Sequence, residues 1–146
     1  MKIEIDIDEK YQEIKVIIQA PQLTQDIEKI VSLMRMINMQ IGVKYEDEMY
    51  LLDTDEILYI ETVDRRTFVY TEDKIYESEL KLYEMEEKLL ERDFLRISKQ
   101  SIVNLRKIKS LKAEINRKIR VTLENGEQIV VSRMYSDELR KKLGLK

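Results

Sequence analysis

The chain of 146 residues contains no cysteine and no histidine. Without cysteine it can form no disulfide and has no thiol nucleophile, a usage that fits a reducing cytoplasm. Without histidine it lacks the side chain that most often serves as a general base and as a metal ligand. No nucleophile–base pair and no cluster of metal ligands appears in the sequence. We therefore expect no enzymatic activity, no metal site and no cofactor.

Long hydrophobic runs are also missing, since the longest apolar stretches span only a few residues. The first residues, Met1-Lys2-Ile3-Glu4, alternate apolar and charged side chains. We therefore expect neither a signal peptide nor a membrane span, and a cytoplasmic location. The length suits one domain, or one domain with an appendage, with room for a real core.

Charge is unevenly distributed along the chain, although the net charge is only −3. Residues 1–91 carry 11 Lys and Arg against 23 Asp and Glu, whereas residues 92–146 carry 15 against 6. A basic C-terminal half in an acidic protein is typical of an anion-binding face. The alternative is a solvated surface whose charges happen to segregate.

The first 39 residues have the pattern of a small extension. Alternation from Met1 to Ile7 predicts a strand, and Ile14–Ile18 predicts a second one after a turn around Glu9-Lys10. Pro21 then precedes a helix with Thr24 as its N-cap. Its apolar positions recur at helical spacing and form one stripe, which we expect to be buried: Leu23, Ile27, Ile30, Val31, Met34 and Ile37. We predict a β-β-α extension over residues 1–39, with Gly42 marking the passage to the next part.

From Gln40 onward, strand patterns follow one another. The sequence predicts strands at Met49–Leu52, Ile57–Thr62, Thr67–Thr71, Lys74–Glu77, Ile108–Ile115, Lys118–Leu123 and Gln128–Val131. Asn125-Gly126 predicts a type I′ hairpin turn. A short helix is expected across Leu80–Leu90, and a basic one after Ser132. We predict a mostly β (α+β) domain of antiparallel sheet with short helices over residues 40–146.

The most informative segment is residues 94–105. Two apolar clusters, Phe94-Leu95-Ile97 and Ile102-Val103-Leu105, flank the polar and basic loop Ser98-Lys99-Gln100-Ser101. Buried flanks would hold this loop rigidly toward solvent. Hydroxyl, ammonium and amide groups side by side suit phosphate oxygens and base edges. The alternative is an ordinary surface loop between core strands.

Three stretches together resemble the LytTR-type DNA-binding domain of bacterial response regulators and small stand-alone regulators. They are Asp55-Glu56-Ile57-Leu58-Tyr59-Ile60-Glu61, then Phe94–Ser98 with Ser101–Leu105, and finally Val130-Val131-Ser132-Arg133. The resemblance covers about residues 40–144, roughly two thirds of the chain. Residues 1–39 look like the extension of the stand-alone members.

The resemblance implies DNA recognition by three loops that enter successive major grooves and bend the duplex. Carried over to this chain, the loops are Asp64-Arg65-Arg66-Thr67, Ser98-Lys99-Gln100-Ser101 and Ser132-Arg133-Met134. The implied DNA-binding residues are Arg65, Arg66, Thr67, Ser98, Lys99, Gln100, Ser101, Ser132 and Arg133. Many members have His in place of Ser98 and a second Arg in place of Met134, so base preference cannot be carried over.

Several basic residues keep a second interpretation. Arg65 and Arg66 can be charges at a hairpin end, and Arg96, which alternates with Leu95 and Ile97, can face a carboxylate on the sheet. Asn104 is interpreted as a turn or backbone-capping residue. The remaining cations of the C-terminal half either face phosphate or are solvated: Lys107, Lys109, Lys112, Arg117, Lys118 and Arg120.

The sequence thus favours a cytoplasmic, sequence-specific DNA-binding transcriptional regulator that is not an enzyme. Its expected partner is double-stranded DNA with repeated half-sites. We also expect a homodimer to which residues 1–39 contribute, because a single apolar stripe must be buried on the domain or on a second copy. The rival interpretation is a protein-interaction module that keeps the fold but has little affinity for DNA.

Overall fold

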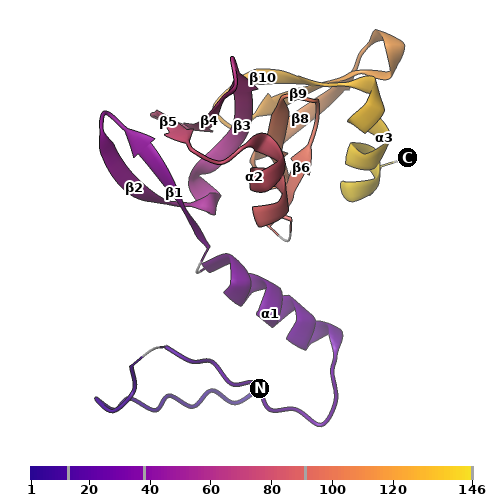
Figure 1. Cartoon of the computed structure of the whole chain (residues 1–146). Helices are drawn as coiled ribbons and strands as arrows, with labels where there is room; N and C mark the ends of the chain where they lie inside the picture. The colour runs from indigo at the N-terminus through magenta and orange to yellow at the C-terminus, as the bar shows by residue number, and fades with distance from the viewer. Residues whose placement is uncertain (13, 38, 91, 146) are drawn as a thin grey trace. The chain divides into compact units, whose positions relative to one another are not determined.

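The computed structural model describes residues 1–12, 14–37, 39–90 and 92–145. The chain divides into two compact units, Met1–Arg35 and Met36–Lys146. Figure 1 shows the course of the chain, with the first unit in indigo and violet.

The first unit contains most of one helix, α1 (Gln25–Ile37), and no strand among its described residues. The amide of Ile27 donates to Thr24 Oγ1 at 3.4 Å, which confirms Thr24 as the N-cap. The turn around Glu9-Lys10 is also present, closed by the amide of Tyr11 on the carbonyl of Asp8 at 3.2 Å.

The prediction of two N-terminal strands was wrong. The described residues of 1–18 form no ladder, and their apolar side chains are exposed, such as Ile3 at 76% and Ile7 at 90%. Apolar and charged side chains alternate here, so a strand would have one apolar face. An isolated two-stranded hairpin, however, is at best marginally stable in water. The described residues of this unit include no third strand to pair with them, so the pattern alone does not produce a sheet.

The second unit is an antiparallel β structure with two short helices, which confirms the predicted fold class. A seven-stranded sheet has the order β2-β1-β5-β4-β3-β7-β6, and a three-stranded sheet has the order β10-β9-β8. The strands of the large sheet are β1 (Gln40–Tyr45), β2 (Glu48–Asp53), β3 (Ile57–Val63), β4 (Arg66–Thr71), β5 (Ile75–Ser78), β6 (Phe94–Arg96) and β7 (Ser101–Asn104). The small sheet has β8 (Ile108–Ala113), β9 (Ile119–Leu123) and β10 (Gln128–Val131), and the helices are α2 (Leu82–Lys88) and α3 (Arg133–Lys142).

Two hydrophobic clusters lie on opposite faces of the large sheet. Ile102 belongs to the first cluster and its neighbour Val103 to the second, because successive strand residues point to opposite faces. The first cluster includes Leu82, Met85 and Leu89 from the α2 region. The second joins the large sheet to the small sheet and to α3 through a separate set of buried residues: Leu58, Tyr59, Leu95, Ile97, Val103, Ile119, Val121, Leu123, Val131 and Leu139.

Two strand boundaries of the second unit differ from expectation. Gly42, taken as a boundary, lies inside β1 and pairs with Leu51 of β2. Strand β8 ends at Ala113, because residues Glu114–Lys118 form the β8–β9 turn, where the amide of Glu114 donates to the carbonyl of Lys118 at 2.8 Å.

The turn at Asn125-Gly126 is present but is not type I′. Among these two residues only Gly126 has a positive φ, 91°. The amide of Gly126 donates to the carbonyl of Leu123, and Asn125 Oδ1 accepts from the amide of Glu127 at 3.1 Å. Asn125 keeps a negative φ while its side chain satisfies the turn, so the loop has three residues and a left-handed glycine.

Candidate nucleic-acid interface

The first expected loop is shorter than the resemblance implied. Val63 pairs with Arg66, so the β3–β4 hairpin loop consists only of Asp64 and Arg65, with φ of 50° and 67°. Positive φ at both central residues is the type I′ pattern, adopted here without glycine. Arg65 is exposed at the tip.

Thr67, predicted to contact DNA, is only 4% exposed, and the prediction disagrees with this burial. Thr67 lies within β4 on the same face as the buried Val69 and Thr71, because side chains alternate along a strand. Its hydroxyl lies 3.5 Å from that of Thr62 on the neighbouring strand. The side chain is therefore part of the sheet interior.

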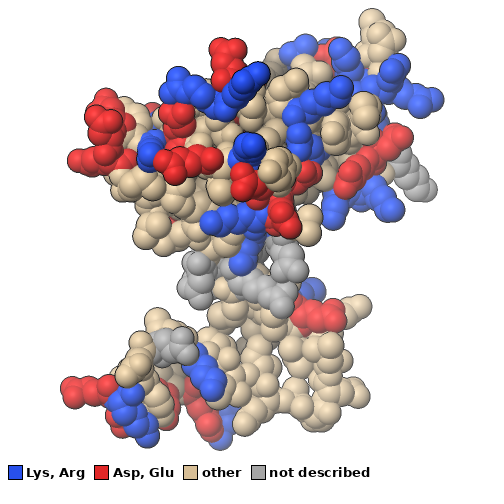
Figure 2. Space-filling model, viewed as in Figure 1, with Lys and Arg blue, Asp and Glu red and all other residues tan. Residues whose placement is uncertain are grey.

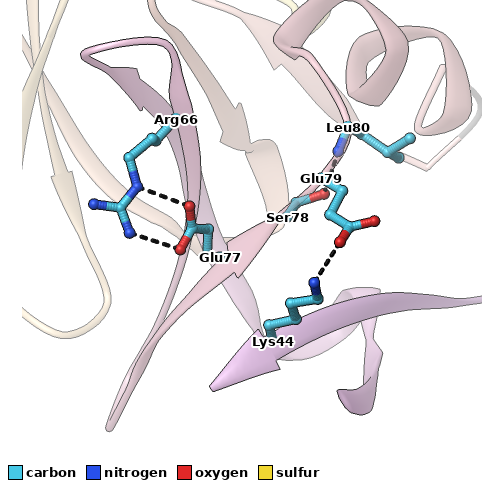
Figure 3. Close-up of polar contacts among 6 residues, drawn as sticks. All are labelled: Lys44, Arg66, Glu77, Ser78, Glu79 and Leu80. Atoms are coloured by element: carbon cyan, nitrogen blue, oxygen red, sulfur yellow. Dashed lines mark hydrogen bonds and ion pairs between the residues drawn. The ribbon is translucent and has the colours of Figure 1, made fainter. Parts of the chain in front are cut away.

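Arg66 forms a bidentate ion pair with Glu77 of β5. Its Nε donates to Oε1 and its Nη2 to Oε2 of Glu77, both at 2.8 Å (Figure 3). The hydrogen bonds from Arg66 hold the pKa of Glu77 below its usual value. The guanidinium also lies over the ring of Phe68, 5.2 Å from its centroid. The free hairpin-end cation is thus Arg65 rather than Arg66.

The second loop is held between buried flanks, as the sequence predicted. Leu95, Ile97, Ile102 and Val103 are each at most 6% exposed. The amide of Ile97 donates to the carbonyl of Ser101 at 3.0 Å, which closes the loop.

Inside this loop the polar groups bond to the chain itself. The amide of Gln100 donates to Ser98 Oγ at 3.1 Å, and the carbonyl of Gln100 accepts from the amide of Thr62 at 2.8 Å. Ser98 and Ser101 are half-buried, whereas Lys99 and Gln100 are exposed. The two residues at the tip are therefore the ones available to a partner.

Arg96 lies beneath the loop rather than on its surface. Its Nη1 donates to Glu86 Oε1 at 3.0 Å, which agrees with the interpretation that Arg96 faces a carboxylate. Its Nε and Nη2 donate to the carbonyls of Ser98 and Lys99, at 2.8 and 2.6 Å. Strand alternation could suggest the first contact, but the two carbonyl contacts depend on how the chain reverses after β6.

The third loop begins at the N-cap of α3, where the sequence placed it. The carbonyl of Ser132 accepts from the amide of Tyr135 at 3.0 Å and from Ser136 Oγ at 2.9 Å. Arg133 and Met134 follow as exposed residues of the first turn, Met134 at 76%.

The second and third loops line one open groove together with the β8–β9 turn. Its lining residues are Ser98, Lys99, Gln100, Asn116, Lys118, Ser132, Arg133, Met134 and Tyr135. The sequence did not identify Asn116, whose left-handed φ of 66° belongs to the turn, and it left Lys118 undecided. The structure thus brings together two of the three predicted loops at one concave surface.

The cations of this region fall into two groups. Among the described residues, Arg65, Lys99, Lys118 and Arg133 are exposed and have no ion pair or side-chain hydrogen bond. In contrast, Arg120 pairs with Glu114, and Lys107 lies 3.9 Å from Glu124. Figure 2 shows mostly Lys and Arg over the part of the second unit that holds the β8–β9 hairpin and α3. Asp and Glu are more frequent over its β1–β2 end.

Within the described ranges, no group of three or more acidic or other metal-binding side chains could hold a metal ion. The helices described there include none that is long and apolar enough to cross a membrane.

Buried Asn104 donates to the carbonyl of Ile57 at 2.9 Å and accepts from the amide of Arg106 at 3.1 Å. This confirms its interpretation as a backbone-capping residue.

Comparison with known proteins gives relatives with this architecture. A solved LytTr DNA-binding domain from Bacillus cereus matches 73% of this chain and 97% of its own length, with a TM-score of 0.67 and 29% identity. The sensory transduction protein LytT of Enterococcus faecalis is 30% identical over 105 residues, which are 72% of this chain but 43% of that protein. The chain therefore spans less than half the length of this relative.

A further relative matches over the full length of both proteins. It is a Staphylococcus aureus (strain MSSA476) protein named as an uncharacterized HTH-type transcriptional regulator, 27% identical over 147 residues and covering 99% of each chain. In the part of the present chain that the structure describes, five strands separate α2 from α3, so these two helices form no helix-turn-helix. The family model of the LytTr DNA-binding domain matches residues 47–144, and the chain therefore belongs to the LytTr DNA-binding domain family.

Proposed function

We propose that the chain is a sequence-specific DNA-binding transcriptional regulator that uses three loop regions in successive major grooves. The contacts to bases and phosphates come from Arg65 at the β3–β4 tip, from Lys99 and Gln100, and from Arg133 at the start of α3. Ser98 and Ser132 line the groove, and Ser101 ends the second loop; these three residues supply hydroxyl groups. Arg66 joins them only if its pair with Glu77 opens, and buried Thr67 contributes to the hairpin rather than to DNA.

The observation that supports this proposal most is the shared groove of the second and third loops. Lys99 and Arg133 both line it, and both are exposed and unpaired among the described residues. A long cation left without a carboxylate on the protein is available to a phosphate or to the O6 and N7 of guanine. Three further observations agree: family membership, the segregated charge and the rigid flanks of the second loop.

The proposal is tested by selecting binding sites from a random duplex library and titrating the selected duplex. A scrambled duplex of the same composition and length is the control, and each titration is repeated at two salt concentrations. We expect the selected site to bind at least about 10³-fold more tightly than the scrambled one. The logarithm of the affinity should fall linearly with the logarithm of the salt concentration, because bound phosphates release counterions.

Equal affinity for the two duplexes would contradict sequence-specific recognition. Absence of binding to either, with a folded protein, would favour the rival interpretation of a protein-interaction module on the same fold. The expected cytoplasmic location and the lack of enzymatic activity stay predictions.

We further propose that the chain acts as a homodimer on repeated half-sites and that α1 contributes to the dimer. Support comes from the apolar stripe of α1, of which Met34 is 40% exposed in the single chain, and from Leu23, which precedes the helix and is 73% exposed. Ile27, Ile30 and Val31 in the same stripe are only half-buried. Burial of such a stripe against its copy would remove apolar area from water, and dimers are the commonest symmetric assembly.

A further inference from the structure

We propose that Arg96 and Glu86 are positioning residues that set the conformation of the second DNA-reading loop without touching DNA. The inference rests on the proposed function of that loop and deepens it. Arg96 is a cation beside the loop, and the inference gives it a role inside the site rather than a contact with the duplex.

The geometry around Arg96 carries the inference. Its side chain is only 19% exposed and leaves β6 toward the loop, where it contacts two successive carbonyls. Nε donates to the Ser98 carbonyl at 2.8 Å and Nη2 to the Lys99 carbonyl at 2.6 Å. Two adjacent peptide groups with fixed carbonyl directions fix the backbone of Lys99, and so the directions in which Lys99 and Gln100 point.

Glu86 completes the arrangement from the other side. Glu86 lies in α2, next to the fully buried Met85. Its Oε1 accepts from Arg96 Nη1 at 3.0 Å. Since Met85 and Leu89 belong to the first hydrophobic cluster, α2 is a fixed support. The loop carbonyls are thereby connected, through one guanidinium and one carboxylate, to the core of the domain.

This chemistry requires arginine. A guanidinium presents five donors in a planar fork, which can serve two carbonyls and a carboxylate in fixed directions at once. A lysine ammonium has the same charge but is a single point on a flexible stem. Lysine at position 96 would keep the electrostatic attraction to DNA and lose the geometry of the loop.

Two further hydrogen bonds depend on the conformation of the loop. The carbonyl of Gln100 accepts from the amide of Thr62 on β3, and the amide of Gln100 bonds to Ser98 Oγ. These bonds report on the loop in the free protein, because their amides are protected only while the loop keeps its conformation. They provide a readout that does not depend on DNA.

The experiment compares Arg96→Lys, Arg96→Gln and Glu86→Gln with Glu87→Gln as matched control. Glu87 lies in the same helix, is exposed and makes no side-chain hydrogen bond or ion pair among the described residues. Affinities for the selected and scrambled duplexes are measured at several salt concentrations. Amide hydrogen exchange at Thr62 and Gln100 is measured without DNA, and thermal unfolding confirms that each variant is folded.

For a positioning pair we expect both Arg96 variants to weaken binding to the selected duplex about tenfold, the effect of losing one well-oriented base contact. In Arg96→Lys, which keeps the charge, binding to the scrambled duplex should not change, whereas Arg96→Gln should weaken it only slightly, through the lost charge. The slope of affinity against salt should stay that of the wild type in both variants. Glu86→Gln should also weaken specific binding, although removal of a carboxylate by itself strengthens attraction to a polyanion. Exchange at the two amides should accelerate in all three variants and not in Glu87→Gln.

Wild-type behaviour of Arg96→Lys, together with a salt slope lowered by about one in Arg96→Gln, would make Arg96 a phosphate ligand and overturn the inference. Tighter DNA binding by Glu86→Gln, equal to that of Glu87→Gln, would do the same for Glu86. If the wild type binds no duplex, the proposed function fails, whereas the exchange measurement still decides whether the pair orders the loop. Unchanged exchange in all variants would overturn the inference by itself.

Discussion

The backbone amide of Ser132 donates a 2.8 Å hydrogen bond to the carbonyl of Ile97. Ser132 is the N-cap of α3, and Ile97 is the last residue before the Ser98–Ser101 loop, so this bond joins two of the proposed DNA-contacting loops. Ile97 belongs to the second hydrophobic cluster, and so does Val131, which directly precedes Ser132. Lys99 and Arg133 are therefore presented by backbone segments that are fixed to each other before DNA binds.

Lys99→Ala and Arg133→Ala are expected to separate DNA binding from folding. Both residues are exposed, so the free energy of unfolding should change by no more than about 0.5 kcal/mol. Replacing a residue that reads a base edge should cost about 1–3 kcal/mol of binding free energy on the selected duplex and much less on a scrambled one. Replacing a residue that touches only phosphate should weaken binding to both duplexes equally and lower the salt slope by about one.

Lys88→Ala is the matched control for these substitutions, because Lys88 is exposed in α2 and makes no side-chain hydrogen bond or ion pair among the described residues. Denaturant titration and fluorescence anisotropy provide the two measurements. Unchanged affinity of Lys99→Ala and Arg133→Ala for both duplexes would make these loops ordinary surface, and would favour a protein-interaction module.

Glu77→Gln is expected to release Arg66 toward DNA. A carboxamide cannot accept both guanidinium donors that Glu77 accepts at 2.8 Å, so the bidentate pair is lost. Glu79→Gln removes the same charge two residues further along the chain. It breaks only the ion pair with Lys44 (Figure 3). If Arg66 can contact DNA, Glu77→Gln should strengthen binding more than Glu79→Gln, and the excess should vanish when Arg66 is also replaced by Met.

Equal effects of Glu77→Gln and Glu79→Gln on DNA affinity would show that only the net charge matters. Arg66 would then be a structural residue of the β4–β5 pair, and Arg65 would be the single arginine at this tip that contributes. The same anisotropy titration decides between the two cases.

Tyr59 should make the fold sensitive to alkaline pH. Burial, followed by its hydrogen bond to Glu127 at 2.9 Å, raises the pKa of Tyr59 above its usual value. The unfolded chain loses the phenolic proton near pH 10 while the folded chain keeps it. Tyr59 therefore supports the fold fully below about pH 10, and this support is lost as the pH rises from there through the folded pKa.

Tyr59→Phe is expected to cost about 0.5–1.5 kcal/mol at neutral pH through the lost hydrogen bond, and to flatten the alkaline decline in stability. Tyr83→Phe is the control, since Tyr83 is 61% exposed. Urea unfolding at about pH 8 and about pH 11 gives the comparison. An equal alkaline decline in the wild type and in Tyr59→Phe would contradict the prediction.

Asn104→Ala should destabilise the fold without a specific effect on DNA recognition. The side chain is 1% exposed and satisfies the carbonyl of Ile57 and the amide of Arg106. Leaving buried polar groups unpaired costs about 1–3 kcal/mol. Denaturant titration should show this loss, while at low temperature the ratio of affinities for selected and scrambled duplexes stays that of the wild type. A changed ratio would make Asn104 part of the reading surface.

The sequence predicted the second loop well because its signal was local. Apolar flanks around four polar residues specify both burial and exposure, and Leu95, Ile97, Ile102 and Val103 are buried accordingly. The contacts of Arg66 and Arg96 could not be predicted in the same way. Glu77, Glu86 and the loop carbonyls become their partners only through strand register and chain reversal, which depend on tertiary structure.

The errors have physical causes as well. Thr67 was carried into the first loop by the family resemblance, although the strand predicted at Thr67–Thr71 places it on the same face as Val69 and Thr71, which is buried. Strand β1 was missed because Gly42 was taken as a breaker, whereas its pairing with Leu51 places it within the ladder. At the N-terminus, the sequence has two segments of strand pattern, but a hairpin of two strands is at best marginally stable without a further strand or a core to pack against.

Ile30→Glu is expected to dissociate the proposed homodimer, whereas Ser32→Glu is not. Ile30 belongs to the apolar stripe of α1, and Ser32 is exposed outside the stripe, so both variants add one charge to the same helix. A carboxylate placed in an apolar interface would be desolvated without a partner, which strongly disfavours association. Sedimentation at tens of micromolar should therefore give a dimer for the wild type and for Ser32→Glu, and a monomer for Ile30→Glu. On a duplex with two half-sites, only Ile30→Glu should lose cooperative binding. A wild-type monomer with the same cooperativity as Ile30→Glu would remove α1 from the assembly.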